Sequence, residues 1–240
     1  MRSVGFVRGR FGQETIHAFV SPVEDVRKAM PEEMDHYALS RQTILAALTG
    51  LNDKLAAEGV IGELCIFGGA AMVLAFNARL STKDVDAIFK PPGIIRRLAA
   101  EVADSMGLPV NWINDGVKGF VSGAPEHTSE GLTQWSHLRM VRPNAEYLLA
   151  MKCMASRAAG YDTQGDRDDI AFLICRTGLR TAEEVLSVVE KFYPPERILP
   201  KTHFMLLEVF ENLAKGNARP ALPISDLSAE SSCAGAGDGE

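Results

Sequence analysis

Two aspartates one residue apart, Asp84 and Asp86, are the side chains of this sequence whose spacing most directly suggests chemistry. The segment 84–89 is predicted to be a strand, and alternate side chains of a strand leave the same face. Two carboxylates held side by side repel each other unless a cation lies between them. Paired carboxylates suit Mg²⁺, which binds one or two of them together with substrate phosphates. The alternative is a solvated acidic face of an edge strand, although aspartate is depleted in strands.

A glycine pair precedes the aspartates. Gly68 and Gly69 follow an apolar strand predicted at 63–67 and precede a short helix predicted at 70–77. Glycines let the backbone approach a phosphate closely at a helix N-terminus. The pair is not a P-loop, because no G-x-x-x-x-G-K-[ST] is present, and a tight strand–helix turn would explain the glycines alone. Together with the aspartates, the pair indicates a phosphoryl- or nucleotidyl-transfer site.

A lysine on the apolar face of a later helix is the next candidate. The helix is predicted from Pro143 to about Ala158, and Lys152 shares one of its faces with Leu148, Met151 and Ala155. Such a lysine either extends to the edge of the apolar stripe or, if buried, needs a carboxylate or phosphate partner.

Asp166 and Asp169 then form an Asp-x-x-Asp pair at the start of a helix predicted from 166 to about 176. Acidic residues favour a helix N-terminus, which is the simpler explanation of both.

The block Leu64–Phe89, with its Gly-Gly turn and Asp-x-Asp strand, resembles the DNA polymerase β-type nucleotidyltransferase superfamily. It is most similar to the minimal, AbiEii-like branch, which includes the nucleotidyltransferase toxins of toxin–antitoxin and abortive-infection systems. The resemblance extends roughly over Leu64–Leu173, because a lysine-bearing helix and an Asp-x-x-Asp helix follow in the order of that branch.

The resemblance implies a role for each of these motifs. It makes Asp84 and Asp86 ligands of Mg²⁺ and assigns Lys152 to the phosphates of a nucleoside triphosphate. Asp166 would pair with the lysine or act as base toward the acceptor, and Asp169 completes its motif.

Phosphate contacts near the glycine pair are expected from the same resemblance. Many members have a serine where Gly69 stands, so here backbone N–H groups would replace the hydroxyl. Arg79 or Lys83 would contact the triphosphate, although solvated loop charges explain them equally well.

A third carboxylate is expected in this superfamily, and Asp115 is the best candidate for a third metal ligand. The alternative is a turn residue, since Asn114-Asp115-Gly116 is a strong turn sequence. With two carboxylates only, one metal would bind where relatives bind two.

These motifs lead to the expectation of a Mg²⁺-dependent nucleotidyltransferase that transfers a nucleoside monophosphate from an NTP to an acceptor hydroxyl. The resemblance implies RNA, for example a tRNA end, as acceptor and a cognate antitoxin as partner. Transfer to a small molecule, as in antibiotic-modifying enzymes, and an inactive nucleotide-binding module are the alternatives. The net charge of −6 mildly favours these two over an RNA substrate.

Composition suggests a cytoplasmic protein with no membrane partner. The four cysteines are far apart, form no C-x-x-C pair and accompany no secretory signal, so we expect reduced thiols, with the first three filling apolar space. The longest apolar run, Leu64–Phe76, is too short to cross a bilayer.

The order of elements predicts an α/β fold, a small mixed-sheet nucleotidyltransferase core followed by a helical C-terminal half. The expected parts are a poorly ordered arm at 1–34, the core at 35–142, the helical part at 143–215 and a disordered tail at 216–240. Further predicted elements are helices at 36–58, 92–106 and 201–213, a helix opened by the capping box Thr181-Ala-Glu-Glu184, and strands at 110–113 and 137–141.

Overall fold

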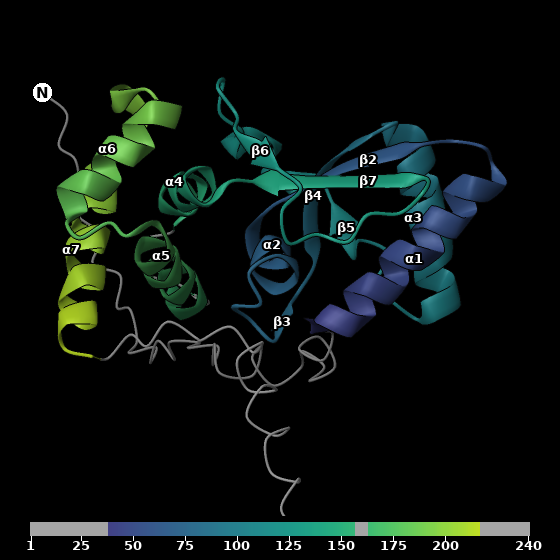
Figure 1. Ribbon diagram of the computed structural model, residues 1–240, viewed down its shortest axis with the longest axis horizontal. Coiled ribbons are helices and arrows are strands. Elements are labelled where there is room, and N and C mark those ends of the chain that lie inside the picture. The colour runs from purple at the N-terminus through teal and green to yellow at the C-terminus, as the bar shows by residue number, and fades with distance from the viewer. Residues whose placement is uncertain (1–37, 157–162, 217–240) are drawn as a thin grey trace, which may run out of the picture. The chain divides into compact units, whose positions relative to one another are not determined.

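The computed structural model describes residues 38–156 and 163–216 (Figure 1). The chain divides into two compact units, Met1–His36 and Tyr37–Glu240, and the first lies outside the described residues. The predicted arm at 1–34 and the predicted tail beyond Gly216 therefore also lie outside them. The predicted core, apart from residues 35 and 36, and the predicted helical part belong to the second unit.

The centre of this unit is a five-stranded mixed sheet with the strand order β5-β4-β2-β7-β6. β2 runs antiparallel to β4 and parallel to β7, β4 and β5 are parallel, and β6 is antiparallel to β7. The strands are β2 (Gly62–Ile66), β4 (Val85–Lys90), β5 (Ile113–Asn114), β6 (His127–Thr128) and β7 (Leu138–Pro143). The predicted α/β fold with a small mixed sheet is confirmed.

A separate two-stranded ribbon precedes the aspartate strand. β1 (Leu39–Ser40) pairs antiparallel with β3 (Ser81–Thr82), so that Leu39 lies opposite Thr82. Only Lys83 and Asp84 separate β3 from β4. The ribbon therefore fixes the point from which the chain enters the strand that carries Asp86.

Seven α-helices complete the described residues, namely α1 (Arg41–Ala57), α2 (Gly68–Leu74), α3 (Pro92–Met106), α4 (Ala145–Ala155), α5 (Thr163–Thr177), α6 (Ala182–Phe192) and α7 (Pro200–Ala214). Their ends follow from local chemistry. The Ser40 hydroxyl accepts a hydrogen bond from Thr43 N at 3.1 Å and caps α1, and the Thr181 hydroxyl caps α6 in the same way. Pro92 begins α3 and Gly107, with φ of 65°, ends it.

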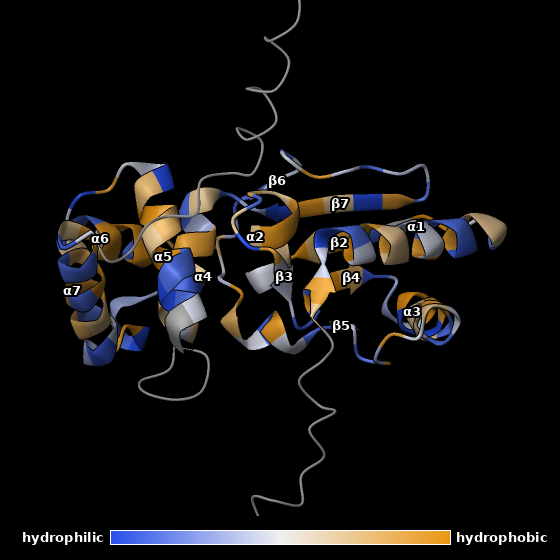
Figure 2. Ribbon diagram, turned by 90° about the horizontal axis from the view of Figure 1, so that it is seen from below, coloured by the Kyte–Doolittle hydropathy of each residue, from blue (hydrophilic) through white to orange (hydrophobic). Residues whose placement is uncertain are grey.

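Helices α1 and α3 pack against each other and against the sheet (Figure 1). Each presents an apolar stripe at helical spacing, and β4 alternates buried Val85, Ala87 and Phe89 with less buried neighbours. Figure 2 shows hydrophobic residues concentrated on β4 and β7, whereas α1, α6 and α7 alternate hydrophobic with hydrophilic ones. The core of this part therefore lies between the sheet and helices α1 and α3.

The helical half is organised around α4, which packs against α5 and α6, while α7 packs against both α5 and α6 (Figure 1). Seven consecutive residues of α4, Tyr147–Cys153, are buried, including Lys152. A helix that is buried all round is a core element, so α4 places its lysine in the interior.

Some predicted boundaries were wrong. Val110 is 76% exposed, and the strand predicted at 110–113 is only Ile113–Asn114. α4 begins after Asn144, whose side chain accepts from Tyr147 N at 2.8 Å, because a side-chain cap and not the preceding proline starts this helix. α1 begins at Arg41, later than the predicted residue 36, because Ser40 supplies its cap.

Within the described residues, no helix combines the length and the apolar character needed to span a membrane. Cys65, Cys153 and Cys175 are free thiols. Cys153 is buried, as expected, but Cys175 is exposed on α5 and does not fill apolar space.

Candidate functional site

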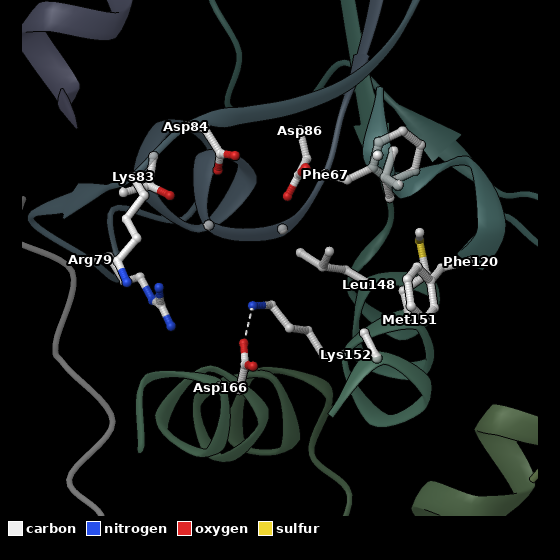
Figure 3. Close-up of a pocket in the computed structure, with 16 residues that line it drawn as sticks. Phe67, Arg79, Lys83, Asp84, Asp86, Phe120, Leu148, Met151, Lys152 and Asp166 are labelled. Carbon is white, nitrogen blue, oxygen red and sulfur yellow. Dashed lines mark hydrogen bonds and ion pairs between the residues drawn. The ribbon is translucent and has the colours of Figure 1, made fainter. Parts of the chain in front are cut away.

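Asp84 and Asp86 lie side by side on the wall of a cavity (Figure 3). Val85 and Ala87, which alternate with them, are fully buried on the opposite face of the strand. Both carboxylates are partly buried and border the same space. The prediction that the two aspartates share one face is confirmed.

The glycine turn packs tightly against the aspartate strand. Gly68 has φ of +56°, and a Cβ at this position would lie 2.9 Å from Asp86 Oδ2. A Cβ at Gly69 would lie 2.4 Å from the Thr82 hydroxyl oxygen. Any larger residue at either position would therefore displace a side chain of the cavity wall, and at Gly68 the positive φ also favours glycine.

Thr82 is a site residue for which no contact was predicted from the sequence. Its side chain borders the cavity, and its hydroxyl occupies the space that a side chain at position 69 would need. A hydroxyl group thus lies at the glycine turn even though residue 69 has none. The hydroxyl-rich pair Ser81-Thr82 before the aspartates was the only sign of this in the sequence.

Asn114 is the second residue without a predicted role. It lies opposite Asp86 in the β4–β5 register, and its Nδ2 donates to Asp84 Oδ2 at 2.7 Å. Its Oδ1 accepts from Gly116 N at 2.9 Å. Both ends of the amide are therefore engaged, and Asn114 orients the Asp84 carboxylate.

Asp115 does not join the two aspartates, contrary to the expectation of a third metal ligand. Its carboxylate forms ion pairs with Arg96 and Lys118, and it is not among the residues that border the cavity. Since side chains alternate along a strand and its extension, Asn114 faces the aspartates and its neighbour does not. Within the described residues, no group of three or more His, Cys, Asp or Glu side chains is placed to hold a metal ion.

Burial disfavours the charged forms of both aspartates. Desolvation raises the pKa of Asp84, against the opposing effects of the Asn114 hydrogen bond and the Lys83 charge. Desolvation and then the negative charge of Asp84 raise the pKa of Asp86, with Lys152 acting in the opposite direction. The pair therefore holds negative charge that its own surroundings do not fully compensate.

Lys152 faces the aspartates from α4, across the cavity (Figure 3). Its Nζ lies 2.8 Å from Asp166 Oδ1 and 2.7 Å from Asp169 Oδ2, the second contact being an ion pair without a well-directed hydrogen bond. The lysine is 8% exposed and does not extend to the surface. The structure thus brings the lysine together with both carboxylates of the Asp-x-x-Asp motif.

Arg79 connects the loop before β3 to the same cluster. Its Nε lies 2.6 Å from Asp169 Oδ1, so Asp169 holds one cation on each of its oxygens. Asp169 is 2% exposed. Burial raises the pKa of its carboxyl group, while Lys152 and Arg79 act in the opposite direction.

The remaining predicted residues border one cavity of about 520 Å³. Gly68, Gly69 and Lys83 lie on its wall with the aspartates, and Figure 3 shows Lys83 and Arg79 on the same side of it as Asp84. The cavity also has an apolar end that the sequence analysis did not predict, formed by Phe67, Val117, Phe120, Leu148, Met151 and Ala155.

Comparison with known proteins adds no family to this geometry. No protein-family model matches the sequence, and no curated protein and no solved structure matches it.

Replacing Asp169 by alanine should destabilise the protein strongly. The change leaves Lys152 and Arg79 without their shared buried partner, and breaking a buried ion pair costs about 3–5 kcal/mol. Urea unfolding of the variant would measure this loss. Asp104→Ala, at an exposed position on α3, is the control and should cost less than about 1 kcal/mol; equal losses for the two variants would contradict the role assigned to Asp169.

Replacing Asp86 by asparagine should stabilise the metal-free protein by about 0.5–1 kcal/mol near pH 7. A raised pKa in the folded state means that the ionised carboxylate disfavours folding above that pKa. The gain should therefore shrink as the pH falls toward the ordinary aspartate value of about 3.9. Thermal melting in EDTA between pH 4 and pH 8 would measure it, with Asp104→Asn, an exposed position on α3, as control.

Proposed function

We propose that this protein is a Mg²⁺-dependent nucleotidyltransferase that transfers a nucleoside monophosphate from an NTP to an acceptor hydroxyl. One observation carries the proposal: the Asp84–Asp86 pair and Lys152 with Asp166 face each other across the cavity that Gly68 and Gly69 border. The motif resemblance named these residues from positions far apart in the sequence. A chance set of charged residues would have no reason to meet in one cavity.

The donor set at the cavity wall fits a divalent cation. Burial and mutual repulsion disfavour the charged forms of the two adjacent carboxylates. A compact cation that prefers oxygen ligands would therefore stabilise these charged forms. Asp84 and Asp86 would hold Mg²⁺. When bound, Mg²⁺ would neutralise charge on the phosphates during an in-line displacement.

Lys152 supplies positive charge for the triphosphate. Its two carboxylate partners differ in burial, since the side chain of Asp169 is 2% exposed and that of Asp166 is 39% exposed. An incoming phosphate therefore displaces the more exposed Asp166 at lower cost, while Asp169 continues to position the lysine. Asp166 is then available as base toward the acceptor hydroxyl.

The glycine turn provides room for the phosphates beside the carboxylates. Neither Gly68 nor Gly69 has a side chain there, and the Thr82 hydroxyl and Lys83 border the same part of the cavity. Backbone N–H groups and the Thr82 hydroxyl thus make the phosphate contact that a serine makes in many members of the nucleotidyltransferase superfamily.

The proposed reaction is a single in-line transfer. The acceptor oxygen attacks the α-phosphorus, the bond from that phosphorus to the bridging oxygen breaks, and pyrophosphate leaves. The proton of the acceptor hydroxyl passes to Asp166 or to water. Lys152 stabilises the charge that builds up on the phosphate oxygens.

The acceptor class rests on the resemblance to the AbiEii-like branch. We propose RNA, for example a tRNA end, as acceptor, with an antitoxin protein as partner in the cytoplasm, where the free thiols of this chain would persist. The net charge of −6 favours a small hydroxyl-bearing acceptor instead, so both acceptor classes enter the test.

Incubation of the protein with each α-labelled NTP, Mg²⁺ and total cellular RNA should label the RNA. Asp86→Ala should reduce labelling by at least about 10³-fold, because charge on the phosphates is no longer neutralised. Asp104→Ala, at an exposed position on α3 that does not border the cavity, should retain full activity. Label on a small product and none on RNA would identify the small-molecule alternative, and NTP binding without transfer would identify the inactive module.

One divalent cation should bind per chain, because the residue opposite Asp86 on the neighbouring strand, Asn114, is neutral and adds no third carboxylate. Electron paramagnetic resonance titration with Mn²⁺ would count the sites. Asp84→Ala should abolish binding, whereas Asn114→Asp should tighten it about tenfold, since ligand charge tunes affinity. Two equivalent sites in the wild type would contradict this count.

A further inference from the structure

The apolar end of the cavity has no role in the phosphate chemistry. Six apolar residues form it, and none of the described lining residues at this end carries a charge: Phe67, Val117, Phe120, Leu148, Met151 and Ala155. Figure 3 shows Phe120 and Met151 close together, with Leu148 between them and the charged end. The cavity is therefore polarised, with carboxylates and cations at one end and apolar side chains at the other.

Phe120 is the notable member of this group. It ends the 3₁₀ helix η3 (Gly116–Phe120), in which no residue is buried, and the phenylalanine itself is 39% exposed. A large aromatic side chain held partly open at the mouth of a cavity contributes less to folding than a buried one would. Its position makes its ring available to a ligand.

The backbone around Phe120 is fixed by two buried tyrosines of the helical half. The Tyr193 hydroxyl donates to the carbonyl oxygen of Phe120 at 2.5 Å, and the Tyr147 hydroxyl accepts from Ser122 N at 2.8 Å. Tyr193 is 1% exposed and Tyr147 is fully buried. These bonds hold the segment in place before any ligand arrives, which lowers the entropy cost of binding.

We infer that the apolar end is the subsite for the base of the nucleotide, with the ring of Phe120 stacking on it. The inference rests on the proposed function, which places the triphosphate between Asp84 and Lys152. A nucleotide has one planar, weakly polar end and one polyanionic end, and the cavity has the same polarity along its length. Its volume of about 520 Å³ lies within the range of pockets that bind small molecules and cofactors.

The side chains at this end of the cavity predict little preference among the four bases. The described lining residues there offer an aromatic ring, a thioether and aliphatic groups, and none has a side-chain hydrogen-bond donor or acceptor of ordinary strength. Stacking on an aromatic ring is tolerant of base identity, because every base has a π face. The four NTPs therefore bind with affinities within about fivefold of one another.

Calorimetric titration separates the two ends of the cavity. Mg-ATP and magnesium tripolyphosphate, which lacks base and ribose, are titrated into the wild type and three variants: Phe120→Ala, Phe120→Tyr and Tyr193→Phe. Phe120→Ala should weaken ATP binding about tenfold and leave tripolyphosphate binding unchanged, since stacking is lost and the phosphate contacts remain. Phe120→Tyr keeps the ring and should bind ATP like the wild type.

Tyr193→Phe removes only the hydroxyl that fixes the Phe120 carbonyl. It should weaken ATP binding by about threefold, because the backbone at Phe120 then loses conformational entropy when ATP binds. Tripolyphosphate binding should not change. Thermal melting confirms that each variant is folded before titration. A loss of affinity for both ligands in a folded Phe120→Ala variant would overturn the subsite, since the residue would then act on the whole cavity.

Two other outcomes distinguish the subsite from the function on which it rests. If ATP and tripolyphosphate bind the wild type equally and Phe120→Ala changes neither, the base subsite is wrong and the nucleotidyltransferase proposal stands. If the wild type binds neither ligand in the presence of Mg²⁺, the proposed function fails and the subsite fails with it.

Discussion

The arrangement of the site depends on one buried carboxylate. Asp169 lies 2.6 Å from Arg79 on one oxygen and 2.7 Å from Lys152 on the other. Arg79 belongs to the loop that leads to the aspartate strand, whereas Lys152 and Asp169 belong to helices of the C-terminal half. Asp169 is only 2% exposed. Because an unpaired buried charge is costly, displacing either cation from this carboxylate would be unfavourable. The two walls of the cavity are therefore held at a defined separation by electrostatics.

The opposite wall is held by close packing. Gly68 brings the backbone to within a methyl group of the Asp86 carboxylate, and Gly69 does the same at the Thr82 hydroxyl. The hydrogen bond from Asn114 limits the rotation of the Asp84 carboxylate. Both carboxylates are thus oriented in an environment that opposes their charge, as is typical of residues kept for function at the expense of stability.

Elements with strong local signals were predicted well. The Asp-x-Asp strand, the proline-initiated α3 and the helix capped by Thr181 follow from alternation, proline geometry and capping, which act within a few residues. The strand predicted at 110–113 was misplaced, since β5 is only Ile113–Asn114, and the segment Gly116–Phe120 was not predicted, because a two-residue strand and a 3₁₀ turn have no periodicity to detect. Their positions come from pairing with β4 and from the tyrosines of the helical half.

The sequence by itself determined which residue types the site contains: paired carboxylates at strand spacing, glycines without side chains, and a lysine on an apolar helix face, all properties of local spacing. Only the tertiary structure decided how they combine. It turned Asn114 toward the aspartates and Asp115 toward Arg96 and Lys118, a choice that a turn sequence leaves open. It also gave Lys152 its two carboxylates and left the ring of Phe120 open to the cavity. These partners are distant in sequence, so their meeting depends on how the helical half packs against the sheet.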